Sequence, residues 1–467
     1  MIKSTLKKAL CIGFAALLVT TSVTAASKKS KSSKKDPYKS VVKQKNPETK
    51  KVWNFNGMNI VIGDWWTNPD AAAASKQQED TKAFQKWINS TYNVNVIQKQ
   101  VAGWETMPNY AANYCLGGKV ANEYMSLIVD GRSAIVGIKQ RLFYDLSKVT
   151  SVNYHDADIY DQVVVKLLEK GKSFYAFNFG VSEPREGMFF NKRLLAEAGY
   201  DRDAPYDLQK EGKWTWAKFE EMCKALTRDT DNDGVVDQYA MSNFYTSFTK
   251  AALTSNGGSA IGRDENGKYY NNAGSDKSME AYNWIQHMFV TYQLPQPADA
   301  AWDYFQTAFV NGQTAFMCHQ EYIAQPNGIL SNMKDDFGFV AFPLGPSGDG
   351  VYKTIHDTPM MVIPNLYSAD EINKMAKAIE LWKGKVPGYD GPDAWKEGYY
   401  AGFRDQRAVD ETITIMAKTP NPESSTLIPG LSREDMCNSI CWAWQTPAEA
   451  YEACKNVWDG LLADVNR

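Results

Sequence analysis

The sequence predicts an α/β protein with two domains. Strand patterns at residues 58–62 and 94–97 flank a helical pattern at residues 78–92, which gives the β-α-β unit of a parallel sheet. Another buried strand is predicted at residues 126–129. Once the N-terminal segments described below are set aside, about 415 residues remain for folding, more than one hydrophobic core usually holds. Ligands of such sheets bind beyond the carboxyl ends of the strands.

The first 25 residues have the features of a secretory signal peptide. A basic start is followed by an apolar run from Ala9 to Val19 and by small residues at the exit. The apolar run is too short to span a membrane. Because Cys11 lies inside this run, it makes a poor lipid-attachment site of the bacterial lipoprotein kind. We therefore expect a secreted protein, on the extracellular face or in the periplasm, without a convincing lipobox.

Residues 26–52 form a predicted disordered tether, because their Lys- and Ser-rich composition cannot bury a core. Removing the three lysines of the signal peptide and the tether's net charge of +8 lowers the formal net charge from −3 to −14. An acidic folded part argues against nucleic acid as a partner. The tether itself is either solvated or in weak contact with wall polymer or membrane head groups, and both interpretations stay open.

The most specific chemical motif is the acidic stretch from residue 229 to residue 237. Its alternate carboxylates, its glycine turn and its final acid have the spacing of a calcium-binding loop. The predicted calcium ligands are Asp229, Asp231, Asp233, Asp237 and the carbonyl of Val235. The match to the helix-loop-helix calcium motif is partial, since Ala240 stands where that motif has a bidentate Glu. The alternative is a solvated acidic turn, because Asp, Asn and Gly are common turn residues.

Six cysteines follow the signal peptide, and they are predicted to be buried free thiols. An even number in a secreted chain permits disulfides, but six cysteines spread over roughly 400 residues do not make a disulfide scaffold. Cys437 and Cys441 lie one helical turn apart. With Cys454 they lack a paired Cys-x-x-Cys motif, so a zinc site is poorly supported.

Three further elements follow from local patterns. Residues 446–449 form a capping box that predicts a final helix beginning at Pro447. Thr215 is a predicted N-cap of a helix with one apolar face, and Trp214 and Trp216 are assigned to the core. The alternating residues 171–177 predict a strand.

Several segments resemble a known family. Residues 190–200, with the sequence Phe-Asn-Lys-Arg-Leu-Leu-Ala-Glu-Ala-Gly-Tyr, resemble a segment of the extracellular solute-binding proteins of ABC importers. Within that family the resemblance is strongest to the sugar-binding branch related to maltose-binding protein. The other segments that carry it, in the family's order, are residues 214–219, 229–239, 308–317, 337–345 and 358–364. The resemblance covers essentially residues 53–467.

The resemblance implies a two-lobed, periplasmic-binding-protein-like (type II) clamp with three crossings between the lobes. The N-lobe would comprise residues 53–182 and 355–388, and the C-lobe residues 183–354 and 389–467. It also implies a monomer that captures a carbohydrate between the lobes, with an oligosaccharide expected. Closure around the sugar would then be recognised by the permease subunits of an ABC importer.

A sugar site needs flat aromatic surfaces and polar groups that bind hydroxyls. The predicted ligand-binding residues are Trp65, Trp66, Asp130 and Arg132 of the N-lobe, Glu183 and Arg185 of the first crossing, and Tyr322, Trp442 and Trp444 of the C-lobe. Glu186 is an alternative in the crossing, and Tyr245 and Trp302 are further candidates. At most one of Trp442 and Trp444 should face the ligand, since a Trp-x-Trp pair on a helix points in opposite directions. His356 and Asp357 can line the cleft or be structural.

Two other functional classes are alternatives for a secreted chain of this kind. A secreted glycoside hydrolase needs paired acids, and Asp130 with Glu183 can be posed as such a pair. Nothing in the sequence selects these two acids, however, and no nucleophile elbow, phosphate loop or His-Glu-x-x-His helix is present. A cell-wall adhesion protein is the third class. We therefore expect a binding protein without catalytic residues.

Overall fold

The computed structural model describes residues 37–356, 359–422 and 424–467. Contacts divide the chain into two units, Met1–Val42 and Lys43–Arg467. In the first unit, the described residues form a turn in which the amide of Val41 donates to the carbonyl of Tyr38 (2.9 Å). The predicted signal peptide lies outside the described residues. None of the helices in the described ranges combines the length and the apolar character that a membrane crossing requires.

The second unit begins with a hydrogen-bonded loop at residues 43–52. Lys45 forms a β-bridge with Val52, and the amide of Trp53 donates to the carbonyl of Gln44 (3.2 Å). The amide of Gln44 in turn donates to the hydroxyl of Tyr92 (2.9 Å). The hydrogen-bonded chain therefore begins before residue 53, where composition alone ended the tether, because backbone bonds and one tyrosine hold this loop.

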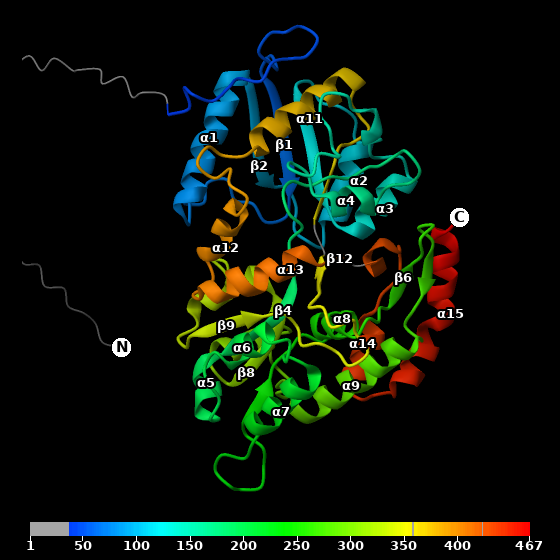
Figure 1. Ribbon diagram of the computed structural model, residues 1–467. Helices are drawn as coiled ribbons and strands as arrows, with labels where there is room; N and C mark the ends of the chain where they lie inside the picture. Colours follow the sequence, from blue (N-terminus) through cyan, green and yellow to red (C-terminus); the bar gives the residue numbers. More distant parts are fainter. Residues whose placement is uncertain (1–36, 357–358, 423) are drawn as a thin grey trace, which may run out of the picture. The chain divides into compact units, whose positions relative to one another are not determined.

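The first sheet has the strand order β11-β3-β1-β2. Strand β1 pairs in parallel with β2 and β3, and β11 pairs antiparallel with β3. Helices α1, α2, α3 and α11 contact its strands (Figure 1). The elements of this part are β1 (Met58–Asp64), α1 (Lys76–Tyr92), β2 (Val94–Gln100), α2 (Met107–Leu116), β3 (Glu123–Val129), α3 (Gly131–Lys139), η1 (Leu146–Lys148), α4 (Gln162–Leu167), β11 (Met360–Val362) and α11 (Ala369–Lys383). The predicted β-α-β unit is thus confirmed.

The second sheet has the order β5-β8-β4-β9. Strand β4 pairs antiparallel with β8 and β9, and β5 runs parallel to β8. The strands of this part are β4 (Glu186–Asn191), β5 (Tyr239–Met241), β8 (Thr314–Gln320) and β9 (Phe337–Val340), and its longer helices are α7 (Trp216–Leu226), α8 (Tyr245–Ser255), α9 (Asp276–Tyr292), α14 (Glu434–Cys441) and α15 (Pro447–Val465). The shorter helices are α5 (Lys192–Glu197), α6 (Ala204–Lys210), α10 (Tyr304–Val310), α12 (Glu397–Tyr400), α13 (Thr414–Lys418) and the π-helix η5 (Ala408–Ile413). The 3-10 turns are η2 (Glu321–Ala324), η3 (Ile329–Asn332), η4 (Ala394–Lys396) and η6 (Ser424–Leu427).

The chain passes three times between the two groups of elements. It leaves the first sheet before β4, returns between β9 and β11, and leaves again after α11 to form η5, which contacts β9. Two small sheets complete the fold: β6 (Ile261–Arg263) with β7 (Tyr269–Asn271), and β10 (Thr354–His356) with β12 (Pro420–Pro422). The predicted two-lobed α/β architecture with three crossings is confirmed.

The first and second crossing segments are tied to one another by one backbone and one side-chain hydrogen bond. The amide of Arg185 donates to the carbonyl of Ile355 (3.1 Å), and the hydroxyl of Thr354 donates to the carbonyl of Glu186 (2.9 Å). Strand β10 continues this contact by pairing in parallel with β12. The first and second crossings are therefore linked directly by hydrogen bonds.

Local capping signals correctly predicted where two helices begin. Thr446 and Glu449 form the expected capping box at the start of α15, and Thr215 accepts a hydrogen bond from the amide of Lys218 at the start of α7. Trp214 and Trp216 are 0% and 4% exposed, which confirms their assignment to the core. The ring of Trp216 stacks on that of Trp284 with centroids 4.0 Å apart. These contacts fix the position of α7 against α9.

The strand predicted at residues 171–177 does not form. Gly171 has a φ of +66°, and Lys170 and Ser173 close a tight turn around it. Phe177 pairs with Met361 at a single β-bridge. Met361 belongs to β11, and the other edge of β11 pairs with β3. Because the segment meets β11 at this one bridge, its alternating side chains pack into the core without extending the sheet.

The cysteines agree with the prediction. None of the six cysteines that the structure describes forms a disulfide, and all are buried except Cys454, which is partly exposed. Cys441 lies within 3.8 Å of the hydroxyl of Thr249, and Cys454 within 3.7 Å of the sulfur of Met436. These thiols are packing groups of the second lobe. Burial accordingly raises the pKa of Cys454 to about 11.

Candidate functional site

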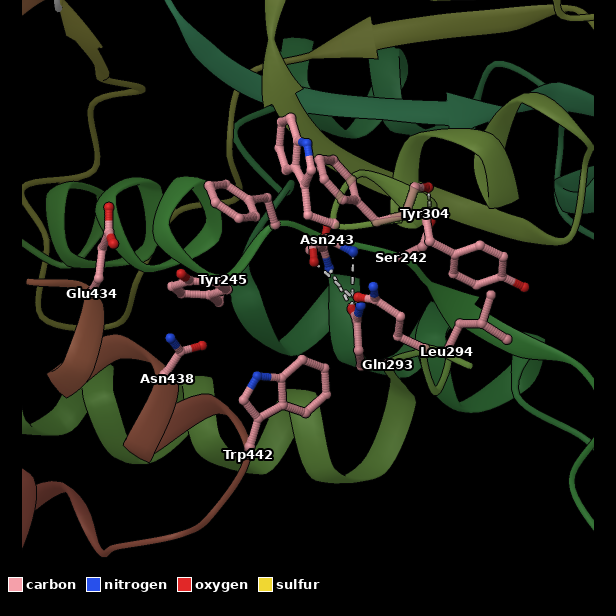
Figure 2. Close-up of a pocket in the computed structure, with 13 residues that line it drawn as sticks. Ser242, Asn243, Tyr245, Gln293, Leu294, Tyr304, Glu434, Asn438 and Trp442 are labelled. Carbon is pink, nitrogen blue, oxygen red and sulfur yellow. Dashed lines mark hydrogen bonds between the residues drawn. The ribbon is translucent and has the colours of Figure 1, made fainter. Parts of the chain in front are cut away.

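A pocket of about 390 Å³ opens beside the second sheet, at the carboxyl end of β5 (Figure 2). Its lining is dominated by aromatic and amide side chains. The lining residues are Ser242, Asn243, Phe244, Tyr245, Gln293, Leu294, Gln296, Trp302, Tyr304, Phe305, Glu434, Asn438 and Trp442. A volume of this size suits a small ligand or one unit of a longer one.

Four parts of the chain supply these residues. Residues 242–244 connect β5 to α8, and residues 293–296 follow the end of α9. Residues 302–305 lead into α10. Helix α14 and its C-cap supply Glu434, Asn438 and Trp442, which recur every four residues and so share one helix face. The pocket is therefore built by elements that lie far apart in the sequence.

Polar contacts behind the lining fix the loop after β5. The backbone amide of Asn243 donates to the side-chain oxygen of Gln293 (3.0 Å), and the side-chain oxygen of Asn243 accepts from the amide of Cys318 (2.6 Å). The hydroxyl of Ser242 donates to the carbonyl of Phe305 (2.9 Å). Because Asn243 and Ser242 are buried and bonded in this way, the pocket floor is rigid before any ligand arrives.

The aromatic wall is also held from behind. Phe244 stacks on Phe305 with centroids 5.6 Å apart, and the edge of Trp302 meets Phe244 at 5.9 Å. His319 also stacks on Phe305, with centroids 5.6 Å apart. Burial lowers the pKa of His319 to about 4, so the ring is neutral at physiological pH and acts as a packing group.

The open side of the pocket carries three exposed or half-exposed rings. Trp302 is 69% exposed and Trp442 is 36% exposed. Figure 2 shows Asn438 beside Tyr245, whose hydroxyl is within hydrogen-bonding reach of that amide. Burial raises the pKa of Tyr245, so its hydroxyl stays protonated and can donate. These groups offer flat apolar faces together with donors and acceptors.

Of the residues predicted from the sequence, Trp442, Tyr245 and Trp302 meet in this pocket. Trp444 does not line it and is 69% exposed. Helix α14 ends at Cys441, and Ala443 has a φ of +51°, so the Trp-x-Trp segment is a turn where a helix was predicted. Of the two tryptophans only Trp442 lines the pocket, and Trp444 follows the turn.

The predicted residues of the N-lobe lie outside this pocket. Trp65 meets Trp66 at 4.8 Å and Trp104 at 5.1 Å in edge-to-face contacts beyond the end of β1. Trp66 is 50% exposed, and Trp104, which the sequence did not single out, is 55% exposed. The carboxylate of Asp64 holds this turn through the amides of Trp66 (3.0 Å) and Thr67 (2.8 Å).

Asp130 and Arg132 follow β3, as predicted, but their local roles differ. Asp130 is the N-cap of α3 and accepts from the amide of Ser133 (2.8 Å). Arg132 is exposed on the first turn of that helix. Neither residue lines the pocket described above.

The first crossing carries a buried charge cluster. Arg185 pairs with Glu183 (2.8 Å) and lies 3.7 Å from Glu321, while its guanidinium faces the ring of Tyr322 at 5.9 Å. Glu183 and Tyr322 are 48% and 47% exposed, so both can reach a ligand. Glu186, the alternative acid, is 0% exposed and pairs with Lys250 (2.7 Å). Glu186 is therefore a structural partner of Lys250.

His356 is likewise structural. It is 3% exposed, and burial lowers its pKa to about 4. Its Nδ1 accepts from the amide of Asn421 (3.3 Å), which ties β10 to β12. Asp357 lies outside the described residues.

Several lining residues escaped the sequence analysis, among them Asn243, Gln293, Tyr304 and Asn438. The positions of Glu434 and Asn438, eight and four residues before Trp442, were the available signal. Tyr304 and Gln293 carried none, because they reach the pocket only through the packing of α9 and α10 against the second sheet.

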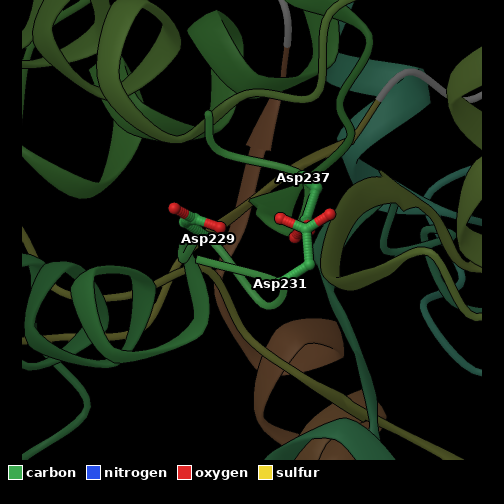
Figure 3. A group of neighbouring side chains, drawn as sticks. All are labelled: Asp229, Asp231 and Asp237. Atoms are coloured by element: carbon green, nitrogen blue, oxygen red, sulfur yellow. The ribbon is translucent and has the colours of Figure 1, made fainter. Parts of the chain in front are cut away.

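The acidic loop forms a separate group of carboxylates (Figure 3). Oxygens of Asp229, Asp231 and Asp237 lie within 4.8 Å of one another. Asp233 is not in this group, since its carboxylate accepts from the amide of Val235 (2.8 Å). The amide of Gly234, which has a φ of +90°, leads the backbone donors that hold the pKa of Asp229 below its usual value. Hard oxygen donors at this spacing fit a calcium ion.

Comparisons with known proteins agree with this architecture. The model of the bacterial extracellular solute-binding protein family matches residues 149–425. No match was found among curated protein sequences. The fold is similar to that of UgpB from Mycobacterium tuberculosis, solved with glycerophosphocholine (15% identity, 86% of this chain and 98% of that chain, TM-score 0.61).

Two oligosaccharide-binding proteins are also similar. One is the cyclic alpha-maltosyl-1,6-maltose binding protein of Arthrobacter globiformis (14% identity, 87% of this chain and 100% of that chain, TM-score 0.62). The other is an ABC substrate-binding protein of Listeria monocytogenes in complex with cycloalternan (13% identity, 88% of this chain and 98% of that chain, TM-score 0.58). At these identities the structures establish a shared fold. Because the family model matches more than half of the sequence, the chain belongs to the bacterial extracellular solute-binding protein family.

Proposed function

We propose that the protein is the carbohydrate-capturing component of an ABC importer and delivers an oligosaccharide to the membrane permeases. The pocket at the end of β5 carries this proposal. Its rings at Tyr245, Trp302 and Trp442 match the apolar faces of a sugar, and its amides match the hydroxyls. Several structurally similar proteins were solved with oligosaccharides, which supports the same ligand class here.

Binding would couple to transport through lobe closure. A sugar in the pocket of the second lobe can also contact the rings of Trp65, Trp66 and Trp104 in the first lobe. It gains affinity from this second contact only when the lobes approach each other. The permease would then recognise the closed form. We expect the protein to act as a secreted monomer whose basic tether makes at most weak contact with wall or membrane.

No catalytic role is included in the proposal. The acids Asp130 and Glu183, posed above as a hydrolase pair, are occupied as a helix cap and as the partner of Arg185. The experiment that tests the function is a thermal-shift screen of the purified protein against mono- and oligosaccharides, polyols and peptides, followed by calorimetric titration of each hit. Stabilisation by sugars alone would support the proposal, whereas turnover of a chromogenic glycoside without any shift would favour an enzyme.

Trp66→Ala and Tyr322→Ala are each expected to weaken sugar binding by about tenfold, since each removes one stacking face. Both rings are about half exposed, so the fold should tolerate their loss. Calorimetric titration with the sugar identified by the screen measures the change. Unchanged affinity in either variant would remove that residue from the site.

We also propose that the loop of Asp229, Asp231 and Asp237 holds a structural calcium ion. Chelation is then expected to lower the melting temperature by a few degrees without abolishing sugar binding, because a ligand bound only to the folded state stabilises it. Differential scanning fluorimetry with a chelator, and again after excess calcium, measures this shift. Asp231→Asn should remove the response, and a wild-type protein indifferent to chelator would indicate a solvated acidic turn.

A further inference from the structure

The pocket lining carries charge of one sign, which is negative. Glu434 is the only carboxylate among its lining residues, and no Lys, Arg or His is among them. Glu434 is exposed, and within the described part of the chain no ion pair involves it. A negative charge is thus presented to the pocket, and no cationic side chain lines the pocket beside it.

The carboxylate has a defined place relative to the other ligand-facing groups. Glu434, Asn438 and Trp442 follow one another along the same face of α14 and its C-cap. Figure 2 shows Asn438 between Glu434 and Trp442 along the helix, with Tyr245 close to Asn438. A sugar ring stacked on Trp442 would therefore extend its substituents along the helix toward the carboxylate.

The aromatic walls favour the same sign of ligand charge. Six aromatic side chains line the pocket, namely Phe244, Tyr245, Trp302, Tyr304, Phe305 and Trp442. The faces of such rings carry negative electrostatic potential, which attracts cations and repels anions. Glu434 and the rings thus act together on any charged ligand.

We propose that the pocket takes a sugar carrying a protonated amino group, with the ammonium against Glu434 and the sugar ring on the aromatic faces. The ammonium donates charge-assisted hydrogen bonds to the carboxylate and lies close to ring faces. Uronic acids and phosphorylated sugars are excluded, because their charge meets Glu434 and no cation. This inference rests on the proposed carbohydrate function and specifies the substrate class within it.

A purely structural role for Glu434 makes a different prediction. An acid in the first turn of a helix interacts favourably with the positive end of the helix dipole. Asp435 lies in the same first turn of α14 but does not line the pocket. Asp435→Asn therefore removes an equal charge from the helix terminus and serves as the matched control for Glu434→Gln.

The test is calorimetric titration of the full secreted chain with matched probes. The first probe set is the three β-1,4-linked trisaccharides of glucose, N-acetylglucosamine and glucosamine, which differ only in the substituent at carbon 2 of each ring. The second set pairs glucose, galactose and mannose each with its 2-amino derivative. Glucuronate supplies the anionic arm. In wild type the amino form of at least one pair should bind about threefold to tenfold more tightly than its neutral counterpart, with a smaller difference at high salt.

Glu434→Gln should abolish this preference for the amino form over its neutral counterpart, and Asp435→Asn should retain it. Equal or tighter binding of the neutral or anionic member in every pair would overturn the inference, as would a preference that survives in Glu434→Gln. Binding restricted to neutral sugars would overturn it while leaving the proposed carbohydrate function intact. If no sugar of any kind binds, the carbohydrate function itself fails.

Discussion

Trp442→Ala is expected to weaken binding of the transported sugar on the order of 100-fold. The indole lines the pocket beside Asn438 and Tyr245 and is 36% exposed, so it presents a ring face to a ligand while its edge meets Phe289 at 5.9 Å. Removing it takes away the largest apolar surface on that side of the pocket. Calorimetric titration gives the affinity, and a melting temperature within a few degrees of wild type would show that the fold persists.

Trp444→Ala is the matched control for this variant. The two tryptophans are two residues apart, but Trp444 is 69% exposed and does not line the pocket. Its loss should change affinity less than about twofold, since an isolated exposed ring contributes little. A similar loss of affinity in both variants would mean that the turn after α14 acts as a unit and that Trp442 is not an individual contact. A loss in neither would place the sugar elsewhere.

Most of the fold could be predicted because its signals are local. The β-α-β unit of β1, α1 and β2 follows from hydrophobic periodicity, and the helix starts at Trp216 and Pro447 follow from side-chain caps. Residues 171–177 show the limit of this approach. Alternating polarity reports that one side of a chain is buried, but it does not report how much of a partner strand is available, and this segment meets β11 at a single β-bridge.

The pocket was harder to predict because it depends on tertiary packing. Trp442, Tyr245 and Trp302 could be identified as candidate aromatics, since a sugar site needs exposed rings, and they do meet. Their polar neighbours Gln293 and Asn243 come from loops whose approach is set by α9 and by the end of β5. Nothing in the order of residues along the chain brings these amides together.

The buried carboxyl of Glu321 lies at the end of β8, next to the first crossing. It is 3% exposed, and its Oε1 lies 3.7 Å from the guanidinium of Arg185. Its Oε2 has no hydrogen-bond partner among the described residues. Burial raises the pKa of Glu321 to about 8, while Arg185 opposes this shift and the charges of Glu183 and Glu186 add to it. Burial dominates because the ion pair is long and shared with Glu183, which binds Arg185 at 2.8 Å.

Glu321→Gln is expected to stabilise the protein increasingly as the pH rises from about 5 to about 8. The pKa of Glu321 is higher in the folded state than in the unfolded state. The protonated carboxyl therefore contributes fully to the free energy of unfolding of wild type below the unfolded-state pKa. This contribution is lost as the pH rises through the folded-state pKa. The loss in the free energy of unfolding is roughly 3 to 5 kcal/mol. Glutamine resembles the protonated acid and does not titrate. Urea denaturation of both proteins at pH 5, 6, 7 and 8 measures the difference.

The difference between the two proteins isolates Glu321 from other buried groups. His319 and His356 also titrate with folding, but burial lowers their pKa values to about 4, so they reduce stability as the pH falls below about 6 in wild type and variant alike. Glu183→Gln is the control, since it removes the other acid of Arg185 from a half-exposed site and should change stability by less than about 1 kcal/mol. If the free energies of unfolding of wild type and Glu321→Gln change in parallel with pH, Arg185 keeps Glu321 ionised. The crossing would then hold a fully charged ion pair at neutral pH.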